Sequence, residues 1–491
     1  MINNKTLSIN PCNCLPVFLL SALVPLYAQS SEWVVTPGVT LEQIYTDNAD
    51  LTSDDQQEES ITRVKPRISV YREGARAKLD LSYAPQYRHY WEGTRSNEVV
   101  HFLKAKGDLE LIEDHFSVDA WATADQHTLN SGGRTGIDSA TGTSELTEVY
   151  TAGISPYLKG ELGRYANLEA RYGLNRVEYS DEDRDSSTGQ RADLVFGSSR
   201  SVNVLPWELH LDQSTINYDN VDEDDRITRV KAEVAYKLNR QWALATALGY
   251  EKYELALNDD VDGDTWSVGF IYTPSQRTRL AAGFGERSFG NDYYLNLSHR
   301  AKRVVWTANY QRDFVTARDE VMRPSLFERE DAFGNLIRDP VLTNPVQATR
   351  SGPTLTEGYY LLDSFSTSLV YSTARSSLAL IAGYTERDYD NSLQTDQLHS
   401  DTRDINASLR YNRMISSRLN GSLSLSWQDH AEDVADGLLD YVQWIIRIGG
   451  GYRIGERTSM NLNLSHLKRD ADYDALGYSE NRVSLNWDMK W

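Results

Sequence analysis

The chain has 491 residues, with 50 lysines and arginines against 71 aspartates and glutamates, and its net charge of −21 argues against nucleic acid as a partner. Cysteine occurs only twice, so a disulfide framework is excluded. The mean hydropathy of −0.53 does not separate a soluble protein from a membrane barrel, because half of each barrel strand faces a polar interior.

The first 28 residues are predicted to be a secretory signal peptide. Lys5 lies in a short polar region, and LPVFLLSALVPLYA (15–28) is an apolar stretch that ends on the small residue Ala28. Both cysteines, Cys12 and Cys14, fall within this segment, so the mature chain contains no thiol. We expect residues 29–491 to form a single domain.

Apolar residues then recur at every second position in many short segments. Examples in chain order are RVKPRISVY (63–71), LDLSYAPQY (79–87), WSVGFIY (266–272), LNGSLSLSW (419–427) and MNLNLSH (460–466). A period of two predicts β-strands that have one apolar face and one polar face.

Two kinds of connection alternate between these segments. Some are short, such as YREGAR (71–76), and others are longer and acidic, such as TSDDQQEES (52–60) and YDNVDEDD (218–225). Short periplasmic turns and long extracellular loops are typical of outer-membrane barrels. We therefore predict an all-β fold: an antiparallel transmembrane barrel of about 22 strands (range about 18–22) in the cell outer membrane. A soluble sandwich or propeller would not explain the signal peptide and the two classes of turn together.

Charged side chains share one parity within several predicted strands. A lysine or arginine that faces lipid at mid-bilayer costs about 2–4 kcal/mol, so we assign the charged faces to the lumen. The predicted lumen-lining residues are Arg63, Lys65, Arg67, Lys78, Arg88, Lys104 and Lys106. We call these seven residues the basic stripe, and it would suit an anionic glycan.

The last ten residues, RVSLNWDMKW (482–491), alternate in the same way. We expect this strand to close the barrel against the first strand. Its aromatic end, with Trp487, Met489 and Trp491, resembles the C-terminal signal that the barrel-assembly machinery recognises.

Motifs of catalysis and cofactor binding are missing from the sequence. There is no Gly-rich phosphate loop, no His-Glu-x-x-His and no Gly-x-Ser-x-Gly, so we predict a protein that is not an enzyme and needs no cofactor. The histidines that could serve a hydrolase at the external rim are His89, His127, His399 and His430.

The acidic segment LNDDVDGD (257–264) offers weak metal-ligand candidates in Asp260, Asp262 and Asp264. The glutamate that a helix-loop-helix calcium site needs is replaced by Gly269, which excludes that site. Solvated loop charge, or acidic loops that bridge cations to lipopolysaccharide, are the remaining interpretations.

Residues 315–361 form the longest stretch without alternation, and they contain Pro324, Pro340, Pro345 and Pro353. Loops of this length are usually functional or disordered. Two hypotheses stay open: the segment folds inward and constricts the pore, or it covers the barrel from outside.

The segments VTPGVTLEQIYTDNADL (35–51) and RVKPRISVYREGARAKLDLSYAPQYRHY (63–90) resemble the opening of a family of outer-membrane β-barrels associated with PEP-CTERM and exopolysaccharide loci. The resemblance implies a role in exporting a surface polysaccharide, together with periplasmic export subunits. A general diffusion porin for small solutes and a structural barrel whose loops bind lipopolysaccharide and cations are the alternatives.

Overall fold

The computed structural model describes residues 33–128, 133–142, 146–181, 184–199, 204–221, 223–256, 260–322, 359–389, 401–434, 437–473 and 476–491. The predicted signal peptide (1–28) and most of the proline-containing segment 315–361 lie outside these ranges. No helix in the described ranges is long and apolar enough to span a membrane.

The described chain is almost entirely β-strand, with one short helix. The first twelve strands are β1 (Val34–Thr46), β2 (Glu59–Glu73), β3 (Ala77–Tyr83), β4 (Gln86–Tyr90), β5 (Glu98–Val100), β6 (Leu103–Ile112), β7 (Phe116–Thr128), β8 (Leu146–Leu162), β9 (Ala166–Tyr179), β10 (Ser187–Ser198), β11 (Trp207–Tyr218) and β12 (Asp225–Lys237). They are followed by β13 (Trp242–Glu254), β14 (Val261–Ser275), β15 (Thr278–Arg287), β16 (Gly290–Arg300), β17 (Val304–Thr316), α1 (Ala317–Met322), β18 (Tyr359–Ser372), β19 (Ser376–Asp388), β20 (Thr402–Met414), β21 (Leu419–Val434), β22 (Gly437–Arg453), β23 (Thr458–Ala471) and β24 (Tyr478–Lys490).

These segments close into an antiparallel barrel of 22 strands. β3 and β4 both pair with β2, so together they form one interrupted barrel strand. On their other side β3 pairs with β6 and β4 pairs with β5, so β5 and β6 together form the next interrupted strand. The first interruption falls at Pro85, which cannot donate a ladder hydrogen bond. β24 pairs antiparallel with β1, from Gly38 opposite Lys490 to Thr46 opposite Arg482. The predicted barrel, its strand number and its closure by the last strand on the first are thus confirmed.

Each strand presents one face to lipid and the other to the lumen. Residues paired directly across neighbouring strands project from the same face, so the ladder register carries this assignment around the ring. Large exposed apolar side chains mark the outer face, as in Leu41 of β1, Leu485 of β24 and Ile446 of β22. Glu42 and Ser484 alternate with them and are buried on the inner face.

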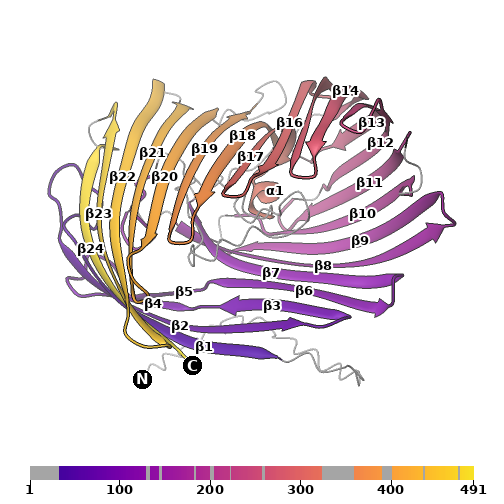
Figure 1. Ribbon diagram of the computed structural model, residues 1–491. Coiled ribbons are helices and arrows are strands. Elements are labelled where there is room, and N and C mark those ends of the chain that lie inside the picture. Colours follow the sequence, from indigo (N-terminus) through magenta and orange to yellow (C-terminus); the bar gives the residue numbers. More distant parts are fainter. Residues whose placement is uncertain are drawn as a thin grey trace, which may run out of the picture.

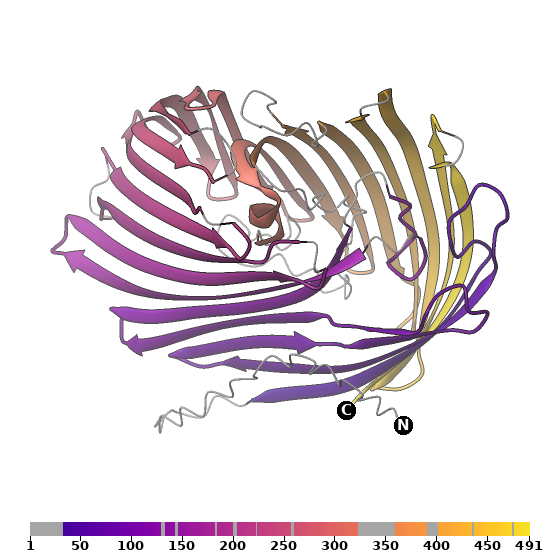
Figure 2. The ribbon, with the colours of Figure 1, turned by 180° about the vertical axis from the view of Figure 1, so that it is seen from behind.

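The two ends of the barrel differ as expected from the sequence. Tight turns join strands at the end where β1 begins and β24 ends, and this is the periplasmic end. Figures 1 and 2 show the ring of strands from opposite sides, with α1 inside the ring rather than on its outer surface.

Candidate functional site

The barrel wall is split between β16 and β17 in its extracellular half. These two strands pair only from Leu295 opposite Tyr310 to Arg300 opposite Val305. Beyond Tyr310, β17 continues to pair with β18 as far as Thr316 opposite Tyr359, but no longer with β16. The tip of the β17–β18 hairpin therefore leaves the wall.

This hairpin tip and α1 bend into the lumen, because they contact strands on the other side of the ring. Six strands separate β10 from β17 along the wall. Neighbouring strands are about 4.8 Å apart, so a contact along the wall would have to reach more than about 30 Å. Arg318 of α1 nevertheless donates hydrogen bonds to Ser187 of β10, at 2.7 Å, and to Asn175 of β9. Those contacts cross the lumen.

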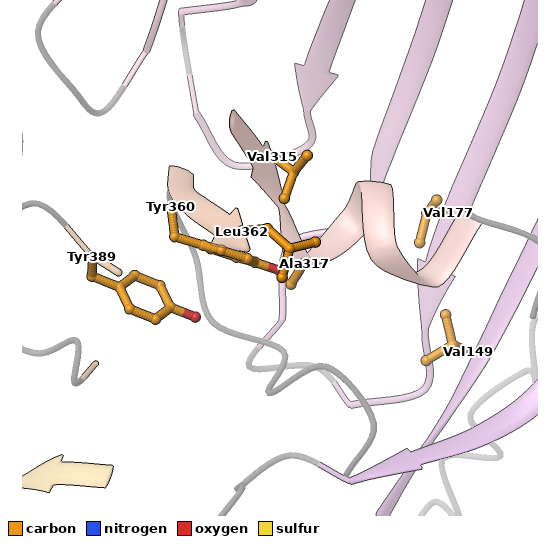
Figure 3. Packing of buried hydrophobic residues seen from close by; sticks show 7 residues of the cluster. All are labelled: Val149, Val177, Val315, Ala317, Tyr360, Leu362 and Tyr389. Atoms are coloured by element: carbon orange, nitrogen blue, oxygen red, sulfur yellow. The ribbon is translucent and has the colours of Figure 1, made fainter. Parts of the chain in front are cut away.

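Two apolar clusters fix the inserted tip. On one side Val315, Ala317 and Tyr360 pack with Val149 of β8 and Val177 of β9 (Figure 3). Burying apolar side chains inside the lumen excludes water from this part of the interior.

The second cluster lies on the opposite surface of the tip. There Phe314 stacks on Tyr359, with ring centroids 5.1 Å apart, and meets Tyr253 of β13 edge to face. The tip is thus held between two parts of the inner wall.

Buried ionic contacts anchor α1 to the barrel wall. Arg387 of β19 donates to both carboxylate oxygens of Glu320, at 2.8 and 3.0 Å, and Tyr360 donates to the same carboxylate at 2.6 Å. Arg387 also reaches Asp404 at 3.3 Å, and Asp404 accepts from His430 at 2.8 Å. Glu320 is fully buried, and a charge in such a place is tolerated only when it is paired.

A second inward element is the segment 133–142, between β7 and β8, which we call the latch loop. It lies against the inner faces of β2, β4 and β22–β24. Asp138 binds Arg482 of β24 through two hydrogen bonds of 2.7 Å and Arg63 of β2 at 2.8 Å. Burial opposes the charge on Asp138, but Arg482 and Arg63 outweigh it and hold the pKa of this carboxyl well below its usual range.

Further side chains from the wall bind the backbone of the latch loop. Arg88 donates to the carbonyl of Ser139 at 2.7 Å, and Arg469 of β23 donates to that of Gly133 at 3.0 Å. Tyr478 donates to the carbonyl of Thr135 at 2.9 Å. The latch loop spans the seam where β24 meets β1.

The residues of the basic stripe lie in two different environments. At its extracellular end, Arg63 and Lys65 pair with Glu42 at 2.8 and 2.7 Å, and Arg88 pairs with Glu98 at 2.9 Å. Arg63 and Arg88 are buried, so these side chains hold the latch loop and are not an open cationic track.

Nearer the periplasm the stripe alternates with acids. Lys78 lies opposite Glu73, and Lys106 lies opposite Asp80. Lys104 is opposite Ser82, and Arg67 is opposite Gly38 on β1. Cations and carboxylates are therefore interleaved along this part of the wall.

The acidic segment has a different structure from the one expected. β14 begins at Val261, so Asp262 and Asp264 are strand residues opposite Lys252 and Tyr250 rather than loop residues. Asp262 and Asp264 have the same parity as the exposed Trp266 of this strand. Asp262 accepts from Tyr250 at 2.8 Å and Asp260 accepts from the Leu255 amide at 3.3 Å. No group of three metal-ligating side chains converges among the described residues.

The histidine candidates are not brought together. His430 is buried against Asp404, and His89 lies at the outer surface edge to face with Trp91. His127 pairs with Thr147 across β7 and β8, while His399 falls outside the described residues. Sequence reasoning missed Glu320, Arg387 and Asp138, whose partners are distant along the chain.

No family model and no curated protein matches this sequence. Among solved structures the chain is similar to the FrpB iron transporter of Neisseria meningitidis (F3-3 variant), with a TM-score of 0.51 and 12% identity over 94% of this chain and 82% of that chain. The siderophore receptor PirA of Pseudomonas aeruginosa gives a TM-score of 0.46 and 11% identity over 94% of this chain and 81% of that chain, and OpdK of Pseudomonas aeruginosa gives 0.36 and 10% over 93% and 99%.

The protein has the fold of outer-membrane β-barrels. Its structural neighbours share only the fold, at low sequence identity, so they do not indicate what this protein does. The segments that lie inside the barrel are therefore the basis for a functional proposal. The hairpin tip with α1 and the latch loop are two segments inside the extracellular end of the barrel. Both consist of the chain's own connections, held by ion pairs.

Proposed function

We propose that this protein is a gated outer-membrane channel and that its cargo is a surface exopolysaccharide exported from the periplasm. The observation behind the proposal is the hairpin tip with α1, which crosses the lumen between β17 and β10. A barrel of about 22 strands is wide enough to need a plug. A polymer exporter needs such width when open and closure at rest, whereas a diffusion porin needs a standing pore.

The anchors of α1 suit a gate because they are paired at both ends. Arg318 holds one wall and Glu320 holds the other through Arg387. The tip can leave the lumen only if both sets of contacts break, so we expect two distinct states, closed and open, without intermediate positions of the tip. Periplasmic export subunits that deliver the polymer would supply the free energy needed to break these contacts.

The proposal is tested in a strain that lacks the gene, by measuring glycan outside the cell against glycan held in the periplasm. Loss outside with accumulation inside is expected. Purified protein in planar bilayers should show rare openings of high conductance. An unchanged surface glycan together with a steady open conductance would refute the export proposal and establish a diffusion porin.

A further inference from the structure

The lumen has two halves of different chemistry. From β6 to β12 the inner face is dominated by charged side chains that bind one another, as in Arg171 with Asp119 at 2.7 Å and Arg191 with Asp212 at 2.5 Å. From β20 to β24, below the buried ionic contacts of the extracellular end, most inner-facing side chains are amides or hydroxyls.

Within the second half, four polar side chains converge on two glycines of β22. A Cβ on Gly449 would lie 2.5 Å from Ser422 Oγ and 2.7 Å from Asn463 Oδ1. A Cβ on Gly451 would likewise overlap Asn420 Oδ1 and Asn461 Oδ1. The side chains of β21 and β23 therefore lie over the bare backbone of β22. We call Asn420, Ser422, Asn461 and Asn463, with these two glycines, the amide patch.

The amide patch lies near the periplasmic mouth and is open to the lumen. β21 begins at Leu419 and β22 ends at Arg453, both beside short turns at that end. Asn420 and Ser422 are exposed, and Asn461 and Asn463 are half-buried. A polymer that enters from the periplasm would meet these side chains before it reaches the latch loop.

The chemistry of the amide patch selects hydroxyl groups. An asparagine side chain offers one acceptor oxygen and two donor hydrogens, and a serine both donates and accepts, so the patch can satisfy sugar hydroxyls in either sense. Neutral hydrogen bonds are individually weak, which lets a chain bind at several points and still move on.

The charges around the amide patch have both signs. Asp488 of β24 borders the patch, where it accepts from Asn461 at 3.0 Å and from Thr40 at 2.6 Å. Arg447 and Arg453 flank the two glycines on the inner face of β22, and Lys490 follows Asp488 on that of β24. The patch is thus a neutral surface between charges of opposite sign, and its own side chains offer hydrogen bonds rather than ion pairs.

We infer that the amide patch is a binding site for a hydroxyl-rich glycan that enters the lumen from the periplasm. This inference rests on the proposed function, because it names the class of its cargo.

The test uses the full-length protein in detergent and maltoheptaose as the probe, with binding followed by titration calorimetry. The variant N461A/N463A removes two amides of the patch. The matched control is N296A/N309A, which removes two amides that contact each other on β16 and β17, also on the inner face. Thermal stability of both variants is measured first.

We expect maltoheptaose to bind, and N461A/N463A to weaken its binding roughly tenfold for two lost hydrogen bonds. N296A/N309A should bind as the native protein does. No binding of maltoheptaose, or an equal loss of its binding in both variants, would overturn the inference. The glycan partition of the deletion strain is independent of these results, so failure of the proposed function would be seen separately.

Discussion

The latch loop provides the sharpest test of how the extracellular end is closed. The variant D138N keeps the size of the side chain but removes the charge that Arg63 and Arg482 share. Removing one partner of a buried ion pair costs about 3–5 kcal/mol. Because 26% of the Asp138 side chain remains exposed, we expect the lower end, about 3 kcal/mol or a 100-fold shift in loop opening.

Amide hydrogen exchange measures that opening directly. The Gly142 amide donates to the carbonyl of Ala49, in the connection between β1 and β2, at 2.9 Å, and it exchanges when the latch loop separates from that connection. In D138N its exchange should accelerate by about 100-fold. The control is D219N, which breaks an exposed two-bonded pair with Arg176 and should cost at most about 1 kcal/mol. If the Gly142 amide exchanges as slowly in D138N as in the native protein, Asp138 does not hold the latch loop.

Acid should release the same loop. The folded pKa of Asp138 lies well below that of an unfolded aspartate, about 3.9, so its contribution to stability is complete above that pH. As the pH falls through the folded pKa the carboxyl is protonated and the contribution is lost. We expect exchange at Gly142 to accelerate in acid in the native protein, and to show a smaller pH dependence in D138N once corrected for intrinsic exchange.

Three further results are expected. E320Q should weaken the Arg387 anchor and raise the open probability in planar bilayers, and a variant as closed as the native protein would contradict this role of Glu320. The outer-face variant I446R should cost about 2–4 kcal/mol in bilayer folding assays, whereas S426R on the inner face should cost much less. Cysteines at Gln43 and Leu485, directly paired across the closing seam, should form a disulfide that alters electrophoretic mobility only under non-reducing conditions.

The sequence alone determined the strands, the alternation of turns and loops, and the closure of the ring. These follow from local rules: the period of two assigns each side chain to one face, and short turns make consecutive strands neighbours. Even segments with weak alternation, such as 293–298 in β16 and 192–198 in β10, are strand residues in the structure, because neighbouring strands complete their ladders.

Only the tertiary structure decided what the lumen contains. Parity places Arg63 and Arg482 on one face of each strand, but it does not say that Asp138 lies between them. Asp138 and Arg482 are 344 positions apart in the chain, and Arg318 and Ser187 are 131 apart. Such contacts depend on the path of a loop across a closed ring, and local patterns do not encode it. The split between β16 and β17 is decided in the same way, because the packing of Phe314 and Val315 inside the lumen outweighs the ladder hydrogen bonds that the wall would offer.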